Sequence, residues 1–108
     1  MSEHNPFRII LRAELAEGVN ADFEQAWLQI GGVITDSEAN LGQWLYHSAE
    51  EDNVYYIVSD WVDEPSFREF EHSDAHIEHR QKLQPYRVAG SMQVMNQVAA
   101  LPKPAMSR

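Results

Sequence analysis

The fold is decided by the stretch VYYIVSDW, residues 54–61, which runs directly into VDEPSFREFEHSDAH, residues 62–76. The first segment is rich in β-branched and aromatic residues and predicts a strand. The Asp63-Glu64-Pro65 run predicts a helix start, because proline is tolerated in the first turn, where its missing N–H leaves no bond unmade. The chain is therefore expected to pass from a buried strand straight into a helix.

Ser73 predicts an interruption of that helix, because serine is a favoured N-cap residue. We expect a second helical stretch over about 74–83, ended by Pro85. Residues 88–99 then return to an extended, partly apolar pattern and predict the last strand.

Two further strands are predicted upstream. Residues 41–48 precede the polar turn 50–53, so they form a hairpin with 54–61. Residues 7–15 predict the first strand, in which Phe7, Ile9, Leu11 and Ala13 are expected to share one face.

A helix is predicted after the first strand, with Asn20 as its N-cap. Its apolar stripe recurs at helical spacing and consists of Phe23, Trp27, Ile30 and Ile34. Gly31 and Gly32 interrupt the stripe. They indicate either a weak last turn or close packing onto the sheet, or else room for a ligand.

The element order is βαββαβ, which is the ferredoxin-like α+β pattern. Two helical segments cover one sheet face and leave the other bare, so we expect a homodimer that closes two sheets into a dimeric α/β-barrel. The 108 residues form a single domain, with a core at about 7–99. The tail, 100–108, is expected to be loose unless it embraces a partner chain.

Composition excludes several function classes. The formal net charge is −9, which disfavours binding to nucleic acid or to an anionic membrane. No apolar run is long enough to span a bilayer, and residues 1–7 contain no apolar signal core, so we expect a cytoplasmic protein. The chain has no cysteine, which removes disulfides, thiolate metal sites and cysteine nucleophiles.

No motif for a nucleophilic serine, a phosphate loop or a dinucleotide is present. On one continuous helix, His72, His76 and His79 would share a face and could bind a metal. Ser73 is expected to break that helix, so we predict no metal site. A histidine acting as a general base fits better, because its pKa lies near neutrality.

The remaining chemistry points to an aromatic pocket. Trp61 ends the third strand, where it is either a core anchor or a wall that stacks a planar ligand. Acidic residues concentrate in 36–78, whereas 79–108 hold five basic residues and no acid. This pattern is either a solvated surface, or a sign that Arg80 or Arg87 lines a site favouring a phenolate or enolate.

Residues 55–76 resemble the antibiotic biosynthesis monooxygenase family. The shared features are a strand ending in Trp61, an acidic turn, Phe67 six residues after the tryptophan, and a break at Ser73 before a histidine-bearing helix. The similarity spans about residues 7–99, and the run 83–92 is most similar to members from bacterial aromatic polyketide pathways.

The resemblance implies a dimer with one pocket per subunit between sheet and helices. It implies a monooxygenase that oxidises a polycyclic phenol or anthrone to a quinone with O2 as co-substrate, without metal or flavin. Trp61 matches the pocket tryptophan, Arg80 lies near the family's helix arginine, and His76 or His79 would be the base. The expected substrate-binding residues are Leu11, Trp27, Trp44, Ile57, Ser59, Phe67 and Phe70.

The chain departs from the family pattern at two asparagines. Quinone-forming members usually have one four residues before the tryptophan, where this chain has Ile57, and often another on the first strand, where it has Leu11. A second hypothesis therefore stays open, namely a non-oxygenase ancillary protein that binds an aromatic polyketide intermediate and assists its cyclisation. Haem degradation fits less well, because Phe70 replaces the second tryptophan of those members.

Overall fold

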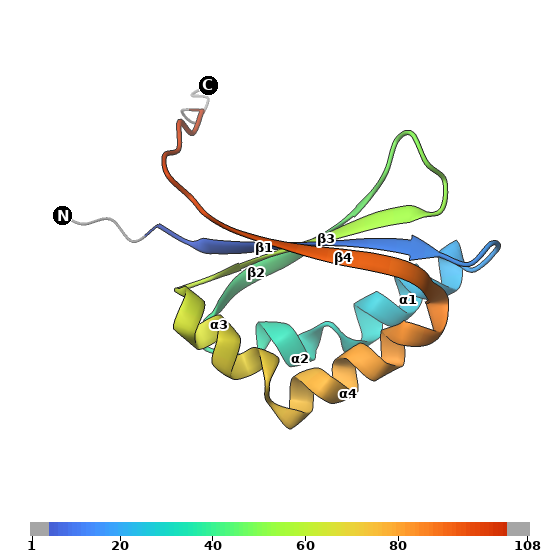
Figure 1. Cartoon of the computed structure of the whole chain (residues 1–108), viewed down its shortest axis with the longest axis horizontal. Helices are drawn as coiled ribbons and strands as arrows, with labels where there is room; N and C mark the ends of the chain where they lie inside the picture. Colours follow the sequence, from blue (N-terminus) through green and yellow to red (C-terminus); the bar gives the residue numbers. More distant parts are fainter. Residues whose placement is uncertain (1–4, 104–108) are drawn as a thin grey trace, which may run out of the picture.

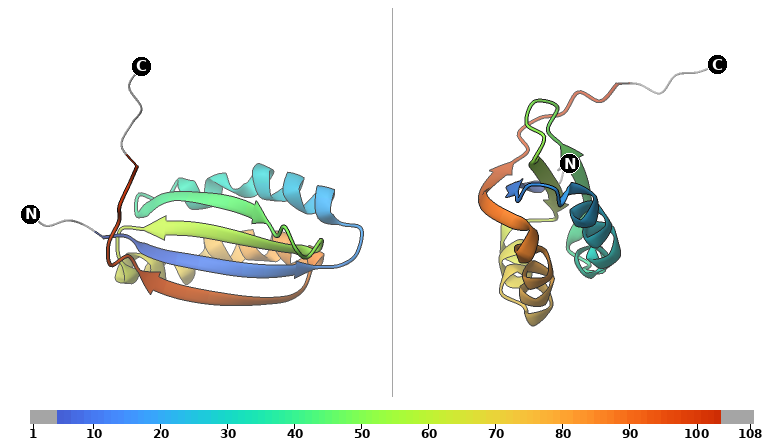
Figure 2. Two further views of the ribbon diagram at one scale, coloured as in Figure 1. Left: turned by 90° about the horizontal axis from the view of Figure 1, so that it is seen from above. Right: turned by 90° about the vertical axis from the view of Figure 1, so that its right-hand side faces the viewer.

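The computed structural model describes residues 5–103. It shows one four-stranded antiparallel sheet in the order β2-β3-β1-β4, with every helix on the same face (Figures 1 and 2). This is the ferredoxin-like α+β arrangement that the sequence predicted. The elements are β1 Phe7–Leu15, α1 Asn20–Ile30, α2 Gly32–Thr35, β2 Asn40–His47, β3 Val54–Trp61, α3 Glu64–Glu71, α4 Asp74–Leu83, a 3₁₀ turn at Gln84–Tyr86, and β4 Arg87–Asn96.

The central strands pair as the alternation predicted. Phe7 lies opposite Trp61 on one side and Asn96 on the other. β4 ends at Asn96, three residues before the predicted end. Beyond that pair, one more backbone hydrogen bond joins the two segments, from the Gln97 N–H to the Pro6 carbonyl at 3.1 Å. Pro6 has no N–H to return, so the pairing stops there. Residues 97–103 form no helix or strand, and residues 104–108 of the predicted tail lie outside the described part.

Of the two expected caps, at Asn20 and Ser73, only the one at Ser73 is confirmed, and Asp63 forms a further cap at the start of α3. Asp63 caps α3 by accepting from the backbone N–H of Ser66 at 2.9 Å, and Ser73 caps α4 by accepting from that of His76 at 3.2 Å. The prediction for Asn20 was wrong, because it is the first residue of α1 and its side chain caps nothing. Its amide instead donates to the Asp52 carbonyl at 2.6 Å and so ties α1 to the β2–β3 turn.

The double glycine breaks the first helix, and the close-packing interpretation is confirmed. α1 ends before Gly31 and α2 begins after it. The side-chain amide of Gln43, on β2, donates to the Gly31 carbonyl at 2.9 Å. A Cβ on Gly31 would stand 3.0 Å from that amide nitrogen and 3.0 Å from the Trp27 carbonyl, so a side chain there would disturb the contact between α1 and Gln43 of β2.

The buried residues form two apolar clusters rather than one. One cluster packs Phe23 of α1 and Leu83 of α4 against Ala13, Leu15, Tyr55 and Ile57. The other packs Phe67 of α3 and Ile34 of α2 against Phe7, Ile9 and Trp61. Leu11 contacts both clusters from the middle of β1. The helical layer therefore meets the sheet firmly at its two ends.

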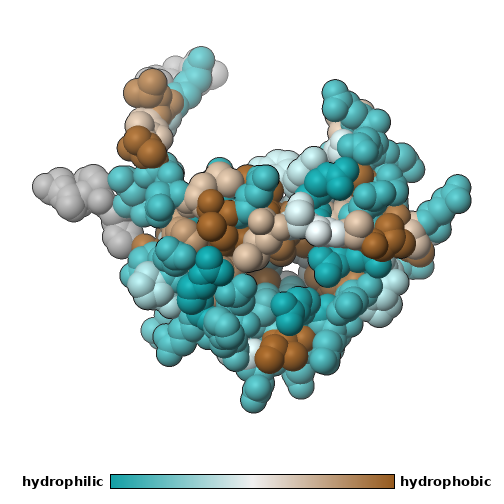
Figure 3. All heavy atoms as spheres, in the orientation of Figure 1, coloured by the Kyte–Doolittle hydropathy of each residue, from teal (hydrophilic) through white to brown (hydrophobic). Residues whose placement is uncertain are grey.

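The opposite face of the sheet has no helix over it (Figure 2). Register places Trp44 of β2 beside Val58 of β3, and Val58 beside Ile10 of β1, so these side chains form an apolar row on that face. Trp44 is 43% exposed and Tyr46 is 55% exposed. In the hydropathy view, apolar residues form a band along the sheet while the helical layer is largely polar outside (Figure 3). No helix within residues 5–103 combines the length and apolarity needed to cross a bilayer.

Replacing the α4 cap tests how the helix bearing His76 and His79 is held. Ser73→Ala removes the acceptor for the His76 N–H and is expected to lower the free energy of unfolding by about 1 kcal/mol. Ser66→Ala is the matched control, because at that position only the backbone N–H is used. Urea unfolding followed by circular dichroism measures both, and equal losses would contradict the assigned cap.

Candidate functional site

A cavity of about 120 Å³ lies between the sheet and helices α3 and α4. It occupies the gap between the two apolar clusters and takes its walls from both. Figure 3 shows a hollow between the apolar band of the sheet and the polar helical layer. The lining residues are Ile9, Leu11, Ala13, Phe23, Ile57, Ser59, Trp61, Phe67, Phe70, Glu71, His76, His79, Arg80, Leu83, Arg87 and Met92.

Trp61 is both core anchor and cavity wall. Its side chain is only 1% exposed, and the indole Nε1–H donates to Ser59 Oγ at 3.0 Å. The ring meets Phe67 edge-on with centroids 5.3 Å apart and lies 5.1 Å from the Phe70 ring. A hydrogen bond and two aromatic contacts therefore fix one orientation of the indole.

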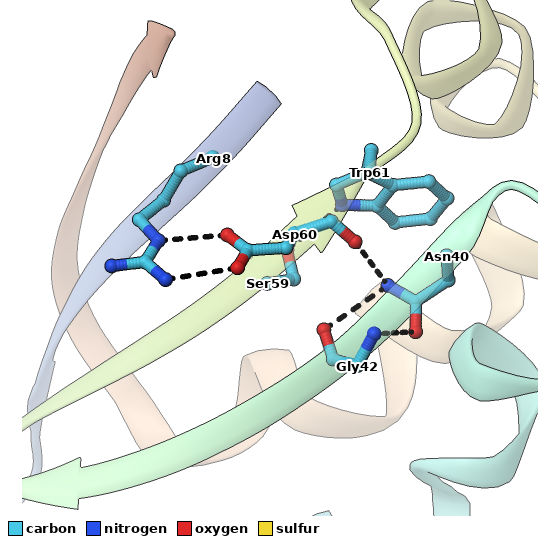
Figure 4. Close-up of polar contacts among 6 residues, drawn as sticks. All are labelled: Arg8, Asn40, Gly42, Ser59, Asp60 and Trp61. Carbon is cyan, nitrogen blue, oxygen red and sulfur yellow. Dashed lines mark hydrogen bonds and ion pairs between the residues drawn. The ribbon is translucent and has the colours of Figure 1, made fainter. Parts of the chain in front are cut away.

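A polar network on the outer sheet face holds the backbone at Trp61 (Figure 4). Arg8 donates two charge-assisted hydrogen bonds to the carboxylate of Asp60, from Nε to Oδ1 at 2.7 Å and from Nη2 to Oδ2 at 2.9 Å. The amide of Asn40 donates to the Asp60 carbonyl at 3.2 Å, and its oxygen accepts from the Gly42 N–H at 2.9 Å. The strand end that carries Trp61 is thus fixed from both neighbouring strands.

The Nδ1 atom of His76 is not available for proton exchange with solvent. This atom is shielded from solvent and has no hydrogen-bond partner within residues 5–103. The ring stands edge-on to Phe70, with centroids 5.3 Å apart. Burial lowers the His76 pKa, and the positive charge of Arg80 and the neighbouring His79 lower it further, while Glu71 raises it. The imidazole is therefore neutral at pH 7 and able to accept a proton.

His79 has no ring nitrogen left for a substrate. It is 6% exposed, and its Nδ1 is also closed off and unpartnered among the described residues. Burial lowers its pKa, whereas a hydrogen bond to the backbone of Ile30 raises it. Because Nδ1 has no partner and the bond favours the protonated ring, Nε2–H must donate to the Ile30 carbonyl.

The glycine break makes that carbonyl available. The N–H of Ile34 bonds to the carbonyl of Gly31 at 3.0 Å instead of to that of Ile30. The carbonyl of Ile30 is thus released from the helical ladder and accepts from His79 on α4. His79 therefore joins two helices and acts as a structural residue of the wall.

Positive charge lies at the rim of the cavity. Arg80 and Arg87 both line it, and neither forms an ion pair within residues 5–103. Glu71 is the acidic lining residue, and it pairs with Arg68 at 3.1 Å. The rim can therefore stabilise an anion in the cavity.

Nine of the eleven residues expected at the site line this cavity: Leu11, Ile57, Ser59, Trp61, Phe67, Phe70, His76, His79 and Arg80. Trp27 and Trp44 do not. They lie in a separate open groove between α1 and the edge strand β2. Trp44 belongs to the row on the outer face, because successive side chains of a strand alternate.

Sequence reasoning missed several apolar members of the lining, including Ile9, Ala13, Phe23, Leu83 and Met92. The alternation of 7–15 already put Ile9 and Ala13 on the face of Leu11, so that signal was available. Nothing local pointed to Met92, whose position depends on its pairing with Leu11.

The three histidines do not share a face. His72 is exposed and its Nδ1 lies 2.7 Å from the Arg68 carbonyl, at the end of α3. Across the described part of the chain, no three His, Asp or Glu side chains come together as a metal-binding group. The break at Ser73 separates His72 from the other two, as expected.

Comparison with known proteins gives one family match. The family model described as antibiotic biosynthesis monooxygenase matches residues 6–82. No curated protein gives a significant match to the sequence.

Solved structures share the fold. SnoaB, a cofactor-independent oxygenase from Streptomyces nogalater, superposes with a TM-score of 0.80 at 17% identity, covering 92% of this chain and 99% of SnoaB. A Bordetella bronchiseptica protein named for the same family gives 0.78 at 22% identity, covering 90% and 99%. One from Caulobacter crescentus gives 0.78 at 14%, covering 89% and 92%.

The buried imidazoles predict a pH-dependent stability. Unfolded histidines titrate near 6.5, but His76 and His79 have lowered pKa values in the fold. At pH values between the lowered pKa values of the folded state and 6.5, the unfolded chain binds more protons than the folded chain. The free energy of unfolding therefore falls as the pH drops below about 6.5. Urea unfolding at several pH values measures the slope. His79→Leu should flatten it, and an equal slope in the His76→Leu/His79→Leu double variant would contradict the assignment.

Proposed function

Because the chain belongs to the antibiotic biosynthesis monooxygenase family, we propose that it is a cofactor-independent monooxygenase. Its substrate would be a polycyclic aromatic polyketide with a phenol or anthrone ring, which it oxidises to a quinone with O2. The observation that carries the proposal is one cavity lined by the fixed indole of Trp61, the imidazole of His76 and the guanidinium of Arg80, which has no ion-pair partner within residues 5–103.

The cavity suits the reacting end of a planar substrate. Its floor is apolar, with Ile9, Leu11 and Ile57, and its walls include the rings of Trp61 and Phe70. At about 120 Å³ it is smaller than the roughly 300–1,000 Å³ of typical ligand sites. One end of a polycyclic molecule would therefore be enclosed, and the rest would extend toward the rim.

The reaction needs a base, an anion-stabilising charge and dioxygen. His76 Nε2 takes a proton from the anthrone carbon, and the guanidinium of Arg80 stabilises the enolate that forms. The enolate gives one electron to O2, and the substrate radical and superoxide combine to form a C–O bond. The peroxide takes a proton, its O–O bond breaks as the second hydrogen leaves the same carbon, and quinone and water result.

His76 suits the role of base better than His79. Deprotonation requires a neutral imidazole with an open nitrogen, and the pKa of His76 is lowered. The nitrogens of His79 are either bonded to Ile30 or shielded. Of the two histidines that the sequence left open as the base, His76 is therefore the one that we propose.

The electron for O2 comes from the substrate anion in this proposal, so neither metal nor flavin takes part. The fold likeness to SnoaB, which is described as a cofactor-independent oxygenase, supports this view.

A second function is favoured by the apolar floor. Ile57 and Leu11 offer no polar contact, and Ser59 Oγ already accepts from Trp61. Such a cavity would also suit an ancillary protein that binds a polyketide and assists its cyclisation.

We further propose that the chain forms a homodimer through the outer sheet face. That face carries the apolar row containing Trp44, Val58 and Ile10, which no element of residues 5–103 covers (Figure 2). Large exposed apolar patches of this kind mark interaction surfaces.

Oxygen uptake tests the proposed reaction. Chelator-treated, flavin-free protein is given anthrone in an oxygen electrode, and the spontaneous rate is subtracted. Uptake with quinone formation is expected, and His76→Gln should lower kcat/KM about 100-fold or more because the general base is lost. The acid limb of kcat/KM against pH should lie below 6.5, since the His76 pKa is lowered.

His79→Gln is the matched control and should keep the rate within a few-fold. Equal losses in the two variants would contradict the role given to His76. If no uptake occurs but anthrone quenches tryptophan fluorescence saturably, the ancillary function replaces the oxygenase.

The dimer is tested by adding a charge to the outer face. Wild-type protein is expected to sediment at twice the monomer mass, and Trp44→Glu should shift it toward monomer because a buried charge opposes association. Ile77→Glu is the control, because Ile77 is an exposed apolar residue of α4, on the helical side of the sheet. A monomeric wild type, or dissociation by both variants, would refute the proposed interface.

A further inference from the structure

Arg87 lies in a notch made by a glycine. It is the first residue of β4, it is half-buried, and it lines the cavity. A Cβ on Gly90 would stand 2.7 Å from Arg87 Nη1 and 3.5 Å from its Cζ. The guanidinium therefore lies close against Gly90, the one residue of β4 that has no side chain.

Strand register places this guanidinium at the far end of the cavity from Trp61. Gly90 is paired with Ala13, and Trp61 is paired with Phe7, both across β1. Six residues of β1 separate the two levels, which is on the order of 20 Å at about 3.3 Å per residue. The apolar floor, with Ile9 and Leu11, lies between them.

The charge of Arg87 is uncompensated. It has no ion-pair partner within residues 5–103. Glu71 is the acid that lines the same cavity, and it is held by Arg68 on α3. Arg80 lowers the pKa of His76 and so lies close to the proposed base, whereas Arg87 is held over Gly90. The two arginines therefore have different surroundings.

We propose that Arg87 and the Gly90 notch form an anion-binding subsite. Its ligand is a carboxylate at one end of a planar, apolar molecule whose rings lie along the apolar floor in the direction of Trp61. A guanidinium binds a carboxylate through two parallel N–H···O bonds, which fixes direction as well as position. That the Trp61 end is the end oxidised rests on the proposed function, whereas the subsite itself concerns binding alone.

The subsite gives a reason for Gly90. Its φ is not in the left-handed region, so the backbone there would accept any residue. What a side chain would displace is the guanidinium of Arg87, and it would also stand 3.1 Å from the Arg12 carbonyl. Gly90→Ala should therefore move Arg87 out of the notch without changing its charge.

Equilibrium binding of two unreactive probes tests the subsite. Anthraquinone-2-carboxylate and anthraquinone-2-carboxamide have the same shape and differ in charge, and neither can be oxidised in the proposed reaction. Quenching of tryptophan fluorescence gives Kd for each at low ionic strength. Wild-type protein should bind the carboxylate more tightly, and Arg87→Gln should weaken it roughly tenfold to a hundredfold, as for the loss of a charged hydrogen-bonded contact. The carboxamide should change less than about threefold.

Three variants separate the possible causes. Gly90→Ala should weaken the carboxylate selectively if the notch positions Arg87, and a thermal unfolding curve confirms that the variant is folded. Lys82→Gln removes one exposed charge from α4 and should leave both Kd values unchanged. Arg80→Gln shows whether the carboxylate preference belongs to the other guanidinium instead.

The proposal is overturned if wild-type protein shows no preference for the carboxylate. It is equally overturned if Arg87→Gln weakens both probes alike, or if the preference survives in Arg87→Gln and disappears in Arg80→Gln. None of these readouts involves O2. A selective loss in Arg87→Gln together with no oxygen uptake from anthrone would keep the subsite and reject the oxygenase.

Discussion

The rest of the structure depends on burying the inner face of the β1–β3 pair. Phe7, Ile9, Ala13 and Leu15 of β1 are all at most 2% exposed, and they lie beside the inner residues of β3. Burying such apolar surface is the main favourable contribution to folding. The two helix pairs, α1 with α2 and α3 with α4, are too short to cover the whole of this surface. They pack at its two ends, and the cavity is the part of the interface that they leave open.

Each of these helix pairs contains a break, and each break positions a histidine that lines the cavity. Ser73 ends α3, caps α4, and so turns His76 toward Phe70. Gly31 ends α1 and releases the Ile30 carbonyl, which then fixes the His79 ring. A pair of continuous helices would satisfy these backbone groups internally. The polar groups of the cavity are thus by-products of where the helices stop.

Local pattern predicted the strands and the cap at Ser73, because alternation and capping depend on neighbouring residues alone, whereas most of the cavity wall was expected from the family resemblance. It could not separate His76 from His79. That distinction depends on which ring nitrogen meets Ile30, more than forty positions away in the chain. Trp27 and Trp44 failed for a related reason. Aromatic character marks a residue for burial, but the topology decides which of several surfaces it covers. Asn20 is a good N-cap residue, yet the β2–β3 turn takes its amide.

The cavity lowers the stability of a domain that has only a small core. The side chains around a space of about 120 Å³ lack the dispersion contacts that a filled core would give them. The unpartnered Nδ1 atoms of His76 and His79 add further cost. A core selected for stability alone would be expected to fill such a space. Here it is instead lined by the imidazole of His76 and by two guanidinium groups that form no ion pair within residues 5–103, which is the arrangement that the proposed binding site requires.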